Sequence, residues 1–226
     1  MVLFSPIMEE IIYKIAISLP GFLLAIVCHE AAHAWMANRF GDPTARLLGR
    51  LSLNPAVHYD LVGTIIFPLI GIAMGGAMFG WAKPVPVDSR HFKNVRAGTF
   101  WVSFAGPLAN IILMFVSAFI FAVIVTKVSP EFSFYNIFSD MVKQSIWINV
   151  LLAVFNLIPF PPLDGSKMVS SMLDYTSARR FEELERFSFV FIFILILTPV
   201  LSYIMAPAIW VSNLLVNIFI HVLASI

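Results

Sequence analysis

The sequence predicts an all-α integral membrane protein with about five transmembrane helices, a re-entrant glycine-rich segment and a small β element. Hydrophobic residues make up 60% of the 226 residues, and the mean hydropathy is +0.91. Charged residues make up only 12% of the chain, against roughly 25% in soluble globular domains. The length allows about five or six spans of around 20 residues each. We therefore expect one membrane-embedded domain over residues 1–226.

Charge and cysteine content exclude several other classes of protein. The formal net charge is only +1 and the basic residues are scattered, so nothing indicates a nucleic-acid partner. The single cysteine, Cys28, excludes an internal disulfide. The first ten residues include Glu9 and Glu10 but no basic region, so we expect no cleavable signal peptide.

Three apolar stretches predict the helices of the first two thirds of the chain. The first runs from about Ile11 to Met36, long enough at about 1.5 Å per residue to cross a hydrocarbon core of about 30 Å. The second spans about Thr99 to Thr126. The third begins near Lys143 and ends in the proline-rich stretch from Ile158.

Two further apolar stretches predict a C-terminal helical hairpin over about residues 187–226. They run from about Phe187 to Met205 and from Pro207 to about Val222, with only Ala206 between them. So short a connection is typical of two antiparallel helices.

The stretch at 61–82 is apolar but unsuited to one straight helix, because Pro68, Gly71, Gly75 and Gly76 interrupt it. Basic residues, which favour the cytoplasmic side, lie in the loops on both sides of this stretch. We therefore expect it to dip into the membrane and return, which places the N-terminus outside and makes the first and third helices parallel. These basic residues are Arg39, Arg46, Arg50, Lys83, Arg90, Lys93 and Arg96.

The first predicted helix carries "HEAAH" at residues 29–33. His29 and His33 are four residues apart, so on a helix both imidazoles project from one face and could hold one zinc ion. Glu30 stays on the same side but points past the metal, where it could take a proton from water. Chance or helix packing could also produce such a pattern. Ionisable residues within a membrane segment are costly, however, and this favours a metal site.

Asp164 is the strongest candidate for a third ligand. It lies in "NLIPFPPLDGSKM", where three prolines break the helix, and backbone broken at membrane depth must line a polar cavity or be buried in protein. Alternatively, Asp164 only caps the helical turn that starts at Gly165. Three histidines are weaker candidates because each lies in a loop or near a terminus, namely His58, His91 and His221.

Four motifs in order resemble the site-2 protease family of intramembrane zinc metalloproteases. They are "HEAAH", "GWAKPVPV" at 80–87, "FAGPLAN" at 104–110 and "NLIPFPPLDG" at 156–165, within residues 21–175. The resemblance implies one zinc ion per chain, held by His29, His33 and Asp164, with Glu30 as the catalytic base. It also implies a catalytic core of three helices within about residues 11–175.

The same resemblance suggests that Asn156 contacts the substrate or the developing oxyanion. An asparagine in a membrane helix could equally hydrogen-bond a neighbouring helix. Compared with some family members, we expect a short form with no PDZ-like insertion and no regulatory domain.

The stretch "KPVPVDSRHF" at 83–92 could bind an unwound substrate as a strand edge. Val85 and Val87 favour a strand, whereas Pro84 and Pro86 cannot donate into a central ladder. An ordinary proline-rich interfacial loop fits the same residues equally well.

The function predicted is hydrolysis of peptide bonds in or near the transmembrane segments of membrane proteins. The expected partners are a transmembrane peptide substrate and the lipid bilayer. Small size and short loops indicate a multi-pass protein of a prokaryotic plasma membrane, with its metal site toward the cytoplasm. A metal or solute transporter would show related broken segments in its two halves, and none is apparent. A non-proteolytic descendant that only binds membrane peptides is disfavoured by the intact glutamate of the motif.

Overall fold

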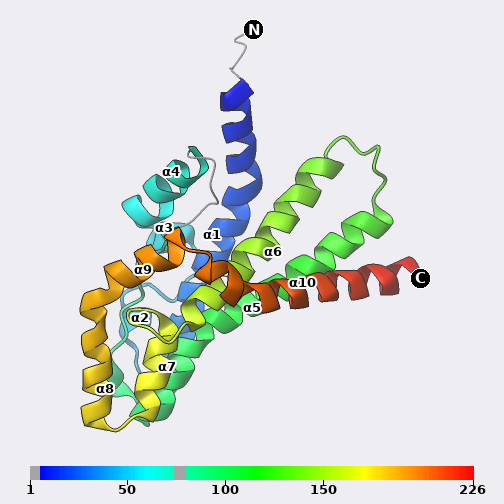
Figure 1. Ribbon diagram of the computed structural model, residues 1–226. Helices are drawn as coiled ribbons and strands as arrows, with labels where there is room; N and C mark the ends of the chain where they lie inside the picture. The colour runs from blue at the N-terminus through cyan, green and yellow to red at the C-terminus, as the bar shows by residue number, and fades with distance from the viewer. Residues whose placement is uncertain (1–5, 74–79) are drawn as a thin grey trace.

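The computed structural model describes residues 6–73 and 80–226, and its described residues form helices and loops without a β-strand. Four helices are long and apolar enough to cross a membrane (Figure 1), which confirms the all-α membrane class. They are α1 (Pro6–Phe40), α5 (Val95–Lys127), α6 (Tyr135–Leu157) and α10 (Val200–Ala224).

Shorter elements connect these helices. α2 (Thr44–Leu47) and α3 (Pro55–His58) follow α1, and η1 (Leu61–Ile66), a π-helix, continues into α4 (Phe67–Ala73). The 3₁₀ turn η2 (Ser89–His91) precedes α5. After α6 come α7 (Asp164–Met172), α8 (Tyr175–Glu182), the 3₁₀ turn η3 (Glu183–Phe187) and α9 (Ser188–Leu197).

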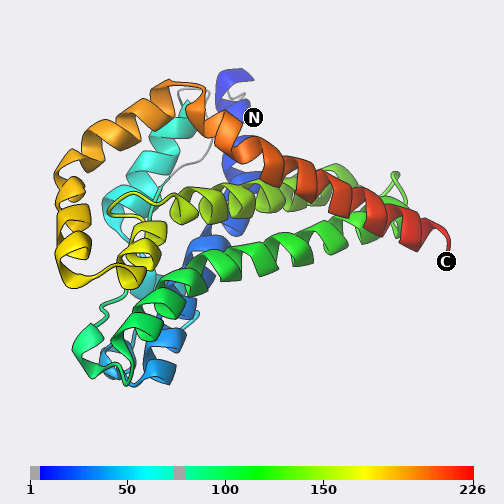
Figure 2. The same ribbon diagram turned by 60° about the horizontal axis from the view of Figure 1, so that its bottom comes forward.

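A bundle of α1, α5 and α6 forms the centre of the molecule (Figures 1 and 2). Phe22 and Ile26 of α1 pack with Ile148 and Leu152 of α6 in one buried cluster. Alanines such as Ala25 and Ala118 are fully buried, which lets the helix backbones approach closely, as is typical of membrane helix interfaces. In Figure 1, α1 and α6 descend toward the end of the molecule that holds α7, while α5 rises, as the sequence predicted.

The segment at 61–82 returns on itself. The N–H of Trp81 donates to the carbonyl of Gly63 at 3.1 Å, and the Thr64 hydroxyl donates to the carbonyl of Trp81 at 2.9 Å. The two ends of the segment therefore lie side by side, as expected for a re-entrant hairpin. Gly75 and Gly76, two of the glycines that supported this prediction, lie outside the described residues.

The predicted β element is not formed as a strand. Residues 80–88 include the expected edge and have no regular secondary structure, because no neighbouring strand among the described residues pairs with them. The backbone N–H groups of Trp81 and Lys83 donate to the carbonyls of Gly63 and His58, and side chains from other parts of the chain contact the residues that follow.

The C-terminal hairpin was predicted incorrectly. The break lies at Thr198 and Pro199 instead of Ala206, because the residue before a proline avoids the helical conformation, and Pro207 lies inside α10. With 10 residues, α9 is about 15 Å long and too short to cross a hydrocarbon core alone. α9 and α10 diverge from their junction in both ribbon views (Figures 1 and 2).

Candidate metal centre

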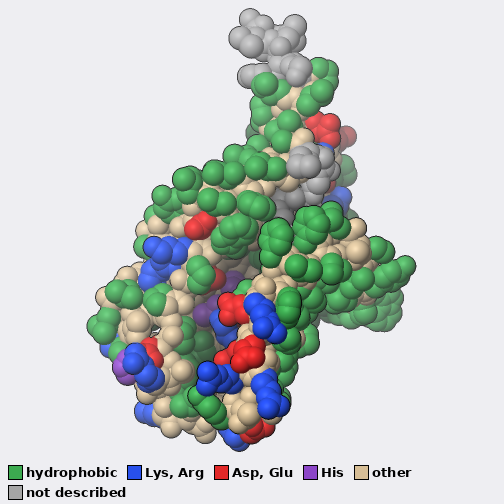
Figure 3. Space-filling view, turned by 60° about the vertical axis from the view of Figure 1, so that its left-hand side comes forward, with side chains coloured by type: hydrophobic (Ala, Val, Ile, Leu, Met, Phe, Trp, Pro, Cys, Tyr) green, Lys and Arg blue, Asp and Glu red, His purple; other side chains and the backbone are tan. Residues whose placement is uncertain are grey.

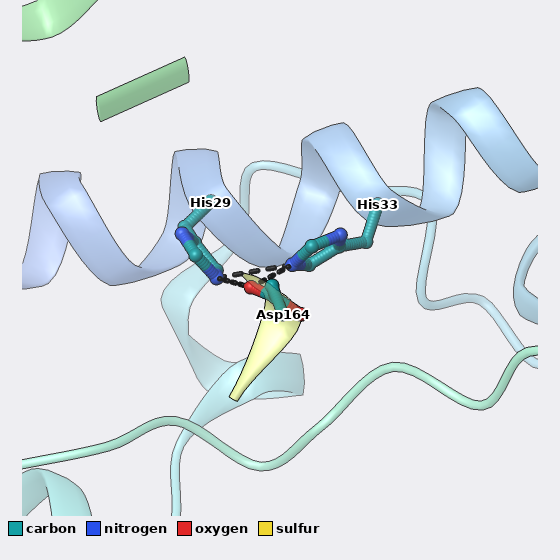
Figure 4. Close-up of side chains that lie close together, drawn as sticks. All are labelled: His29, His33 and Asp164. Carbon is teal, nitrogen blue, oxygen red and sulfur yellow. Dashed lines mark hydrogen bonds and ion pairs between the residues drawn. The ribbon is translucent and has the colours of Figure 1, made fainter. Parts of the chain in front are cut away.

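The structure brings His29, His33 and Asp164 together (Figure 4). Nε2 of His29 lies 3.0 Å from Nε2 of His33, and Oδ2 of Asp164 lies 3.2 Å from each of these nitrogens. Both histidines lie on one face of α1, while Asp164 is the first residue of α7. Three potential ligand atoms from two distant parts of the chain therefore converge on one buried point.

The other ring nitrogen of each histidine is also engaged. Nδ1 of His29 lies 2.7 Å from the side-chain oxygen of Asn110, and Nδ1 of His33 lies 2.7 Å from the backbone carbonyl of Val102. Both partners are acceptors, so each neutral imidazole carries its proton on Nδ1 and turns the lone pair of Nε2 toward Asp164.

This donor set fits a zinc ion. Two imidazole lone pairs and a carboxylate oxygen that converge in this way repel one another unless a cation lies between them. Ligand atoms about 2.0–2.1 Å from a tetrahedral zinc are separated by about 3.3 Å, close to the 3.0–3.2 Å seen here. Three protein ligands leave a fourth position open, as in catalytic zinc sites.

Gly106 leaves the room that this site needs. A Cβ atom added at Gly106 would overlap Nε2 of His33 and Cε1 of His29, so α5 can pass the two histidines only because residue 106 has no side chain. Gly106 belongs to the quoted "FAGPLAN" motif, but its role depends on what lies opposite it in space and is not visible in the motif itself.

Asn110 and Asn149 continue the polar contacts into the bundle, and both are fully buried. The Asn110 amide donates to the carbonyl of Ala25 at 3.1 Å and to the side-chain oxygen of Asn149 at 3.0 Å. The Asn149 amide in turn donates to the carbonyl of Ser145 at 2.8 Å. Neither residue was predicted as part of the site from the sequence, although asparagines within apolar helices are a recognisable signal.

The structure also bears on the alternative role of Asp164. The N-terminus of α7 has no side-chain cap hydrogen bond, and the carboxylate of Asp164 points at the two histidines. Gly165 allows this placement, because a Cβ atom there would overlap the carbonyl of Leu157 at the end of α6. The metal-binding group formed by the described residues does not include His58, His91 or His221.

A cleft of about 890 Å³ surrounds the three residues. In Figure 3, histidine side chains lie recessed in a hollow bordered by acidic and basic side chains. Glu30, Val85, Val87 and Asn156 all line this cleft, so the structure gathers every site residue that the sequence predicted. Their individual placements differ.

Glu30 accepts a hydrogen bond from the backbone N–H of Val85 at 2.8 Å. The Asn156 amide donates to the carbonyl of Leu152 in its own helix at 3.0 Å, which leaves its second N–H for another acceptor. The hydrogen bond between Glu30 and Val85 orients the backbone at Val85, because it turns the N–H of this residue toward the cleft.

Known proteins of similar sequence decide the family. Residues 131–198 match the model of peptidase family M50. The chain is 38% identical over 189 residues to "Putative zinc metalloprotease YwhC" of Bacillus subtilis, an alignment that covers 82% of each protein. The chain belongs to peptidase family M50. It is 28% identical over 184 residues to "Putative zinc metalloprotease Rip2" of Mycolicibacterium smegmatis, covering 80% of this chain and 67% of that protein.

Membership of family M50 makes the chain a zinc-dependent metallopeptidase, which disfavours the transporter considered from the sequence. A third relative, "Putative zinc metalloprotease Rip2" of Mycobacterium tuberculosis, is 27% identical over 190 residues, or 80% of this chain and 67% of that protein. No solved structure is significantly similar to this M50 peptidase.

Proposed function

We propose that this metallopeptidase cleaves peptide bonds in or near the transmembrane segments of membrane proteins. The observation that carries the proposal is that His29 and His33 lie on a helix of 35 residues that is apolar enough to span a bilayer, with Asp164 brought against them from α7. A protease for soluble substrates has no need to bury its site among spanning helices. In this proposal, these three residues hold the zinc ion.

Zinc, when bound, supplies a Lewis acid that lowers the pKa of water toward about 7. Glu30 takes a proton from the attacking water and passes it to the leaving amine. The free amide N–H of Asn156 donates to the oxygen of the scissile carbonyl as negative charge develops on it. The support for both roles is that both side chains line the cleft.

Val85 and Val87 bind the substrate as an extended segment. A helical substrate hides its carbonyls behind its own hydrogen bonds, so it must be locally unwound before attack, and an open strand edge can hold the unwound part. Among the described residues, the carbonyl of Val85 and both backbone polar groups of Val87 have no hydrogen-bond partner. These groups are therefore free to pair with a peptide.

The proposed location is the plasma membrane of a bacterium, with several spans and the cleft toward the cytoplasm. The three relatives described above are bacterial. Basic residues, which favour the cytoplasmic side, line or flank the cleft, among them Arg96 and Lys167.

The test uses purified protein in liposomes and a panel of synthetic single-span peptides. Each peptide has a span of leucine and alanine with a helix-breaking glycine at a different depth, and a matched soluble peptide carries the same central residues. We expect cleavage of spanning peptides, loss of cleavage in Glu30→Gln, and one zinc per chain in both proteins. Cleavage of the soluble peptides alone, or a fully active Glu30→Gln, would overturn the proposal.

A further inference from the structure

The segment at 83–88 poses a physical problem, because Pro84, Pro86 and the residues before them favour extended backbone, and Asp88 is extended, yet the segment belongs to no sheet. Pro84, Val85 and Val87 line the cleft, yet no strand among the described residues pairs with them. An extended chain without a ladder loses conformational entropy on ordering and gains no backbone hydrogen bonds from a neighbouring strand. One backbone hydrogen bond, from the N–H of Lys83 to the carbonyl of His58 at 2.8 Å, anchors its first residue. Side chains must hold the rest of the segment in place.

Arg50 holds its beginning. Nη2 of Arg50 donates to the carbonyl of Lys83 at 2.6 Å and to that of Pro84 at 3.3 Å. The side chain is only 9% exposed, and Arg50 forms no ion pair with any described carboxylate. Its Nε is buried without a hydrogen-bond partner among the described residues. Burying a guanidinium without a counter-ion is costly, so this arginine is hard to explain as a stabilising residue.

Asp42 holds the other end. Its Oδ2 accepts the backbone N–H of Asp88 at 2.7 Å, while its Oδ1 accepts the backbone N–H of Thr44 at 2.9 Å. Asp42 is fully buried, and both oxygens of its carboxylate are engaged. Asp42 and Arg50 lie in the same short stretch of chain, directly after the end of α1, the helix that carries His29 and His33.

The two contacts leave one edge of the segment free. In an extended chain, the N–H and C=O of alternate residues point to the same side. The carbonyl of Pro84, which Arg50 contacts at 3.3 Å, and the N–H of Asp88, which Asp42 accepts, lie on one side. The carbonyl of Lys83, which Arg50 contacts at 2.6 Å, lies on the other side, at the very beginning of the segment. Val85 and Val87 therefore present their polar groups to the other side, where the N–H of Val85 meets Glu30.

We propose that Asp42 and Arg50 act as a clamp that holds residues 83–88 extended beside the metal centre as a preformed docking edge for the substrate. Both are positioning residues, because they act through the segment and touch no reacting atom. The inference rests on the proposed function. The proposed clamp also explains why the predicted β-strand is not formed, since the edge acquires a partner strand only when a peptide binds.

The experiment measures kcat, KM and zinc content of Arg50→Gln and Asp42→Asn on the single-span peptides. A hydrogen bond to a charged group is worth roughly a tenfold change in binding, so we expect KM to rise about tenfold in each variant with zinc content unchanged. Arg46→Gln is the matched control. Arg46 lies in α2 between the two clamp residues, is exposed and forms no hydrogen bond or ion pair with the described part of the segment, so its variant should behave as wild type.

Two further variants separate a docking role from a structural one. Val87→Pro removes a free donor of the edge, and adding Arg50→Gln to it should raise KM little further, because both changes disable the same edge. Arg50→Lys keeps one charged donor and should restore part of the lost affinity, and it replaces Arg50→Gln if that variant fails to fold.

Unchanged KM in both clamp variants would overturn the inference, as would a KM increase that comes with loss of zinc. Full additivity of Arg50→Gln with Val87→Pro would also count against it. An active Glu30→Gln would instead overturn the proposed function, so failures of the two proposals are distinguishable.

Discussion

Nδ1 of His29 lies 2.7 Å from the side-chain oxygen of Asn110, which stands on a different helix. This contact fixes which nitrogen of His29 carries the proton. It also ties the candidate metal centre to the polar core of the bundle, because Asn110 donates to Asn149 of α6. The geometry of the site is therefore set by three helices together.

Asn110→Ala should weaken zinc binding. Partners that orient a metal-binding histidine typically contribute 10- to 100-fold in metal affinity, so we expect a loss of about that size. Competition with a chelator of known zinc affinity measures it. Asn156→Ala is the control, because Asn156 lines the cleft without contacting either histidine, and its affinity should stay the same. An Asn110→Ala variant with wild-type affinity would contradict the assignment.

Gly106→Ala should abolish zinc binding without unfolding the bundle, because the added methyl group would occupy the space beside both imidazoles. Metal analysis of the purified variant measures the zinc content. Gly21→Ala is the matched control, since its Cβ would lie 3.1 Å from Ser145 and far from the ligands in the chain. A full zinc complement in Gly106→Ala would show that the site can expand.

Asn156→Ala should lower kcat by about 10²- to 10³-fold, the usual effect of removing one donor to a developing oxyanion. KM should change little, because the hydrogen bond strengthens only as charge develops. Steady-state cleavage of a single-span peptide gives both constants. If the variant kept its kcat, Asn156 would be a purely structural residue that bonds the carbonyl of Leu152.

Zinc removal should lower the melting temperature, because the ion would link α1 to α7. A ligand that binds only the folded state also stabilises that state relative to the unfolded one. Tryptophan fluorescence on heating, with and without a chelator, tests this, and added zinc should restore the midpoint. Glu30→Gln should retain the effect and His33→Ala should lack it. If zinc removal lowered the melting temperature of His33→Ala by the same amount, the stabilising ion would lie at another site.

The contribution of Asp42 to stability should disappear in acid. Burial acts to raise the pKa of Asp42, but hydrogen bonds from Thr44 and from the N–H of Asp88, together with nearby His91, lower its pKa below the usual 3.8. A carboxyl whose pKa is depressed by folding stabilises the protein above its unfolded pKa, and this is lost as the pH falls through its folded value.

The melting temperatures of wild type and Asp42→Asn should therefore differ most above about pH 5, begin to approach each other near about pH 4 and converge only at lower pH, below the folded pKa of Asp42. Thermal unfolding measured from neutral pH into strong acid tests this. Repeating the series in His91→Gln removes the imidazole that lies 3.4 Å from Asp42, so the contribution of the carboxylate is seen without it. A difference that persists unchanged into strong acid, where the carboxyl is protonated, would contradict the role of the charged carboxylate.

Local sequence patterns predicted the structural features that depend on a single helix or on a single interruption of a helix. The spacing of His29 and His33, and the prolines ahead of Asp164, each determine where a side chain points, and the structure brings these three residues together. The ends of the last helices were predicted incorrectly, because Pro199 and Pro207 look alike in the sequence. Pro199 precedes a helix, whereas the longer α10 accommodates Pro207 in its interior.

Features that depend on packing between distant segments of the chain could not be predicted from local sequence patterns. Gly106, Asn110, Asp42 and Arg50 matter because of what lies opposite them in space. An arginine after a membrane helix usually marks the cytoplasmic side, so nothing in the sequence distinguished the buried Arg50 from the exposed Arg46.

The prolines at 84 and 86 give the segment beside the cleft two unequal sides. The side of the segment that carries the two prolines offers no N–H between residues 84 and 87. Two copies of the enzyme therefore cannot pair as β-strands through this side. In the proposed docking mode, the opposite side would pair with one partner strand. Each molecule would accordingly process its peptides singly, and a second peptide would have to wait until the first had left.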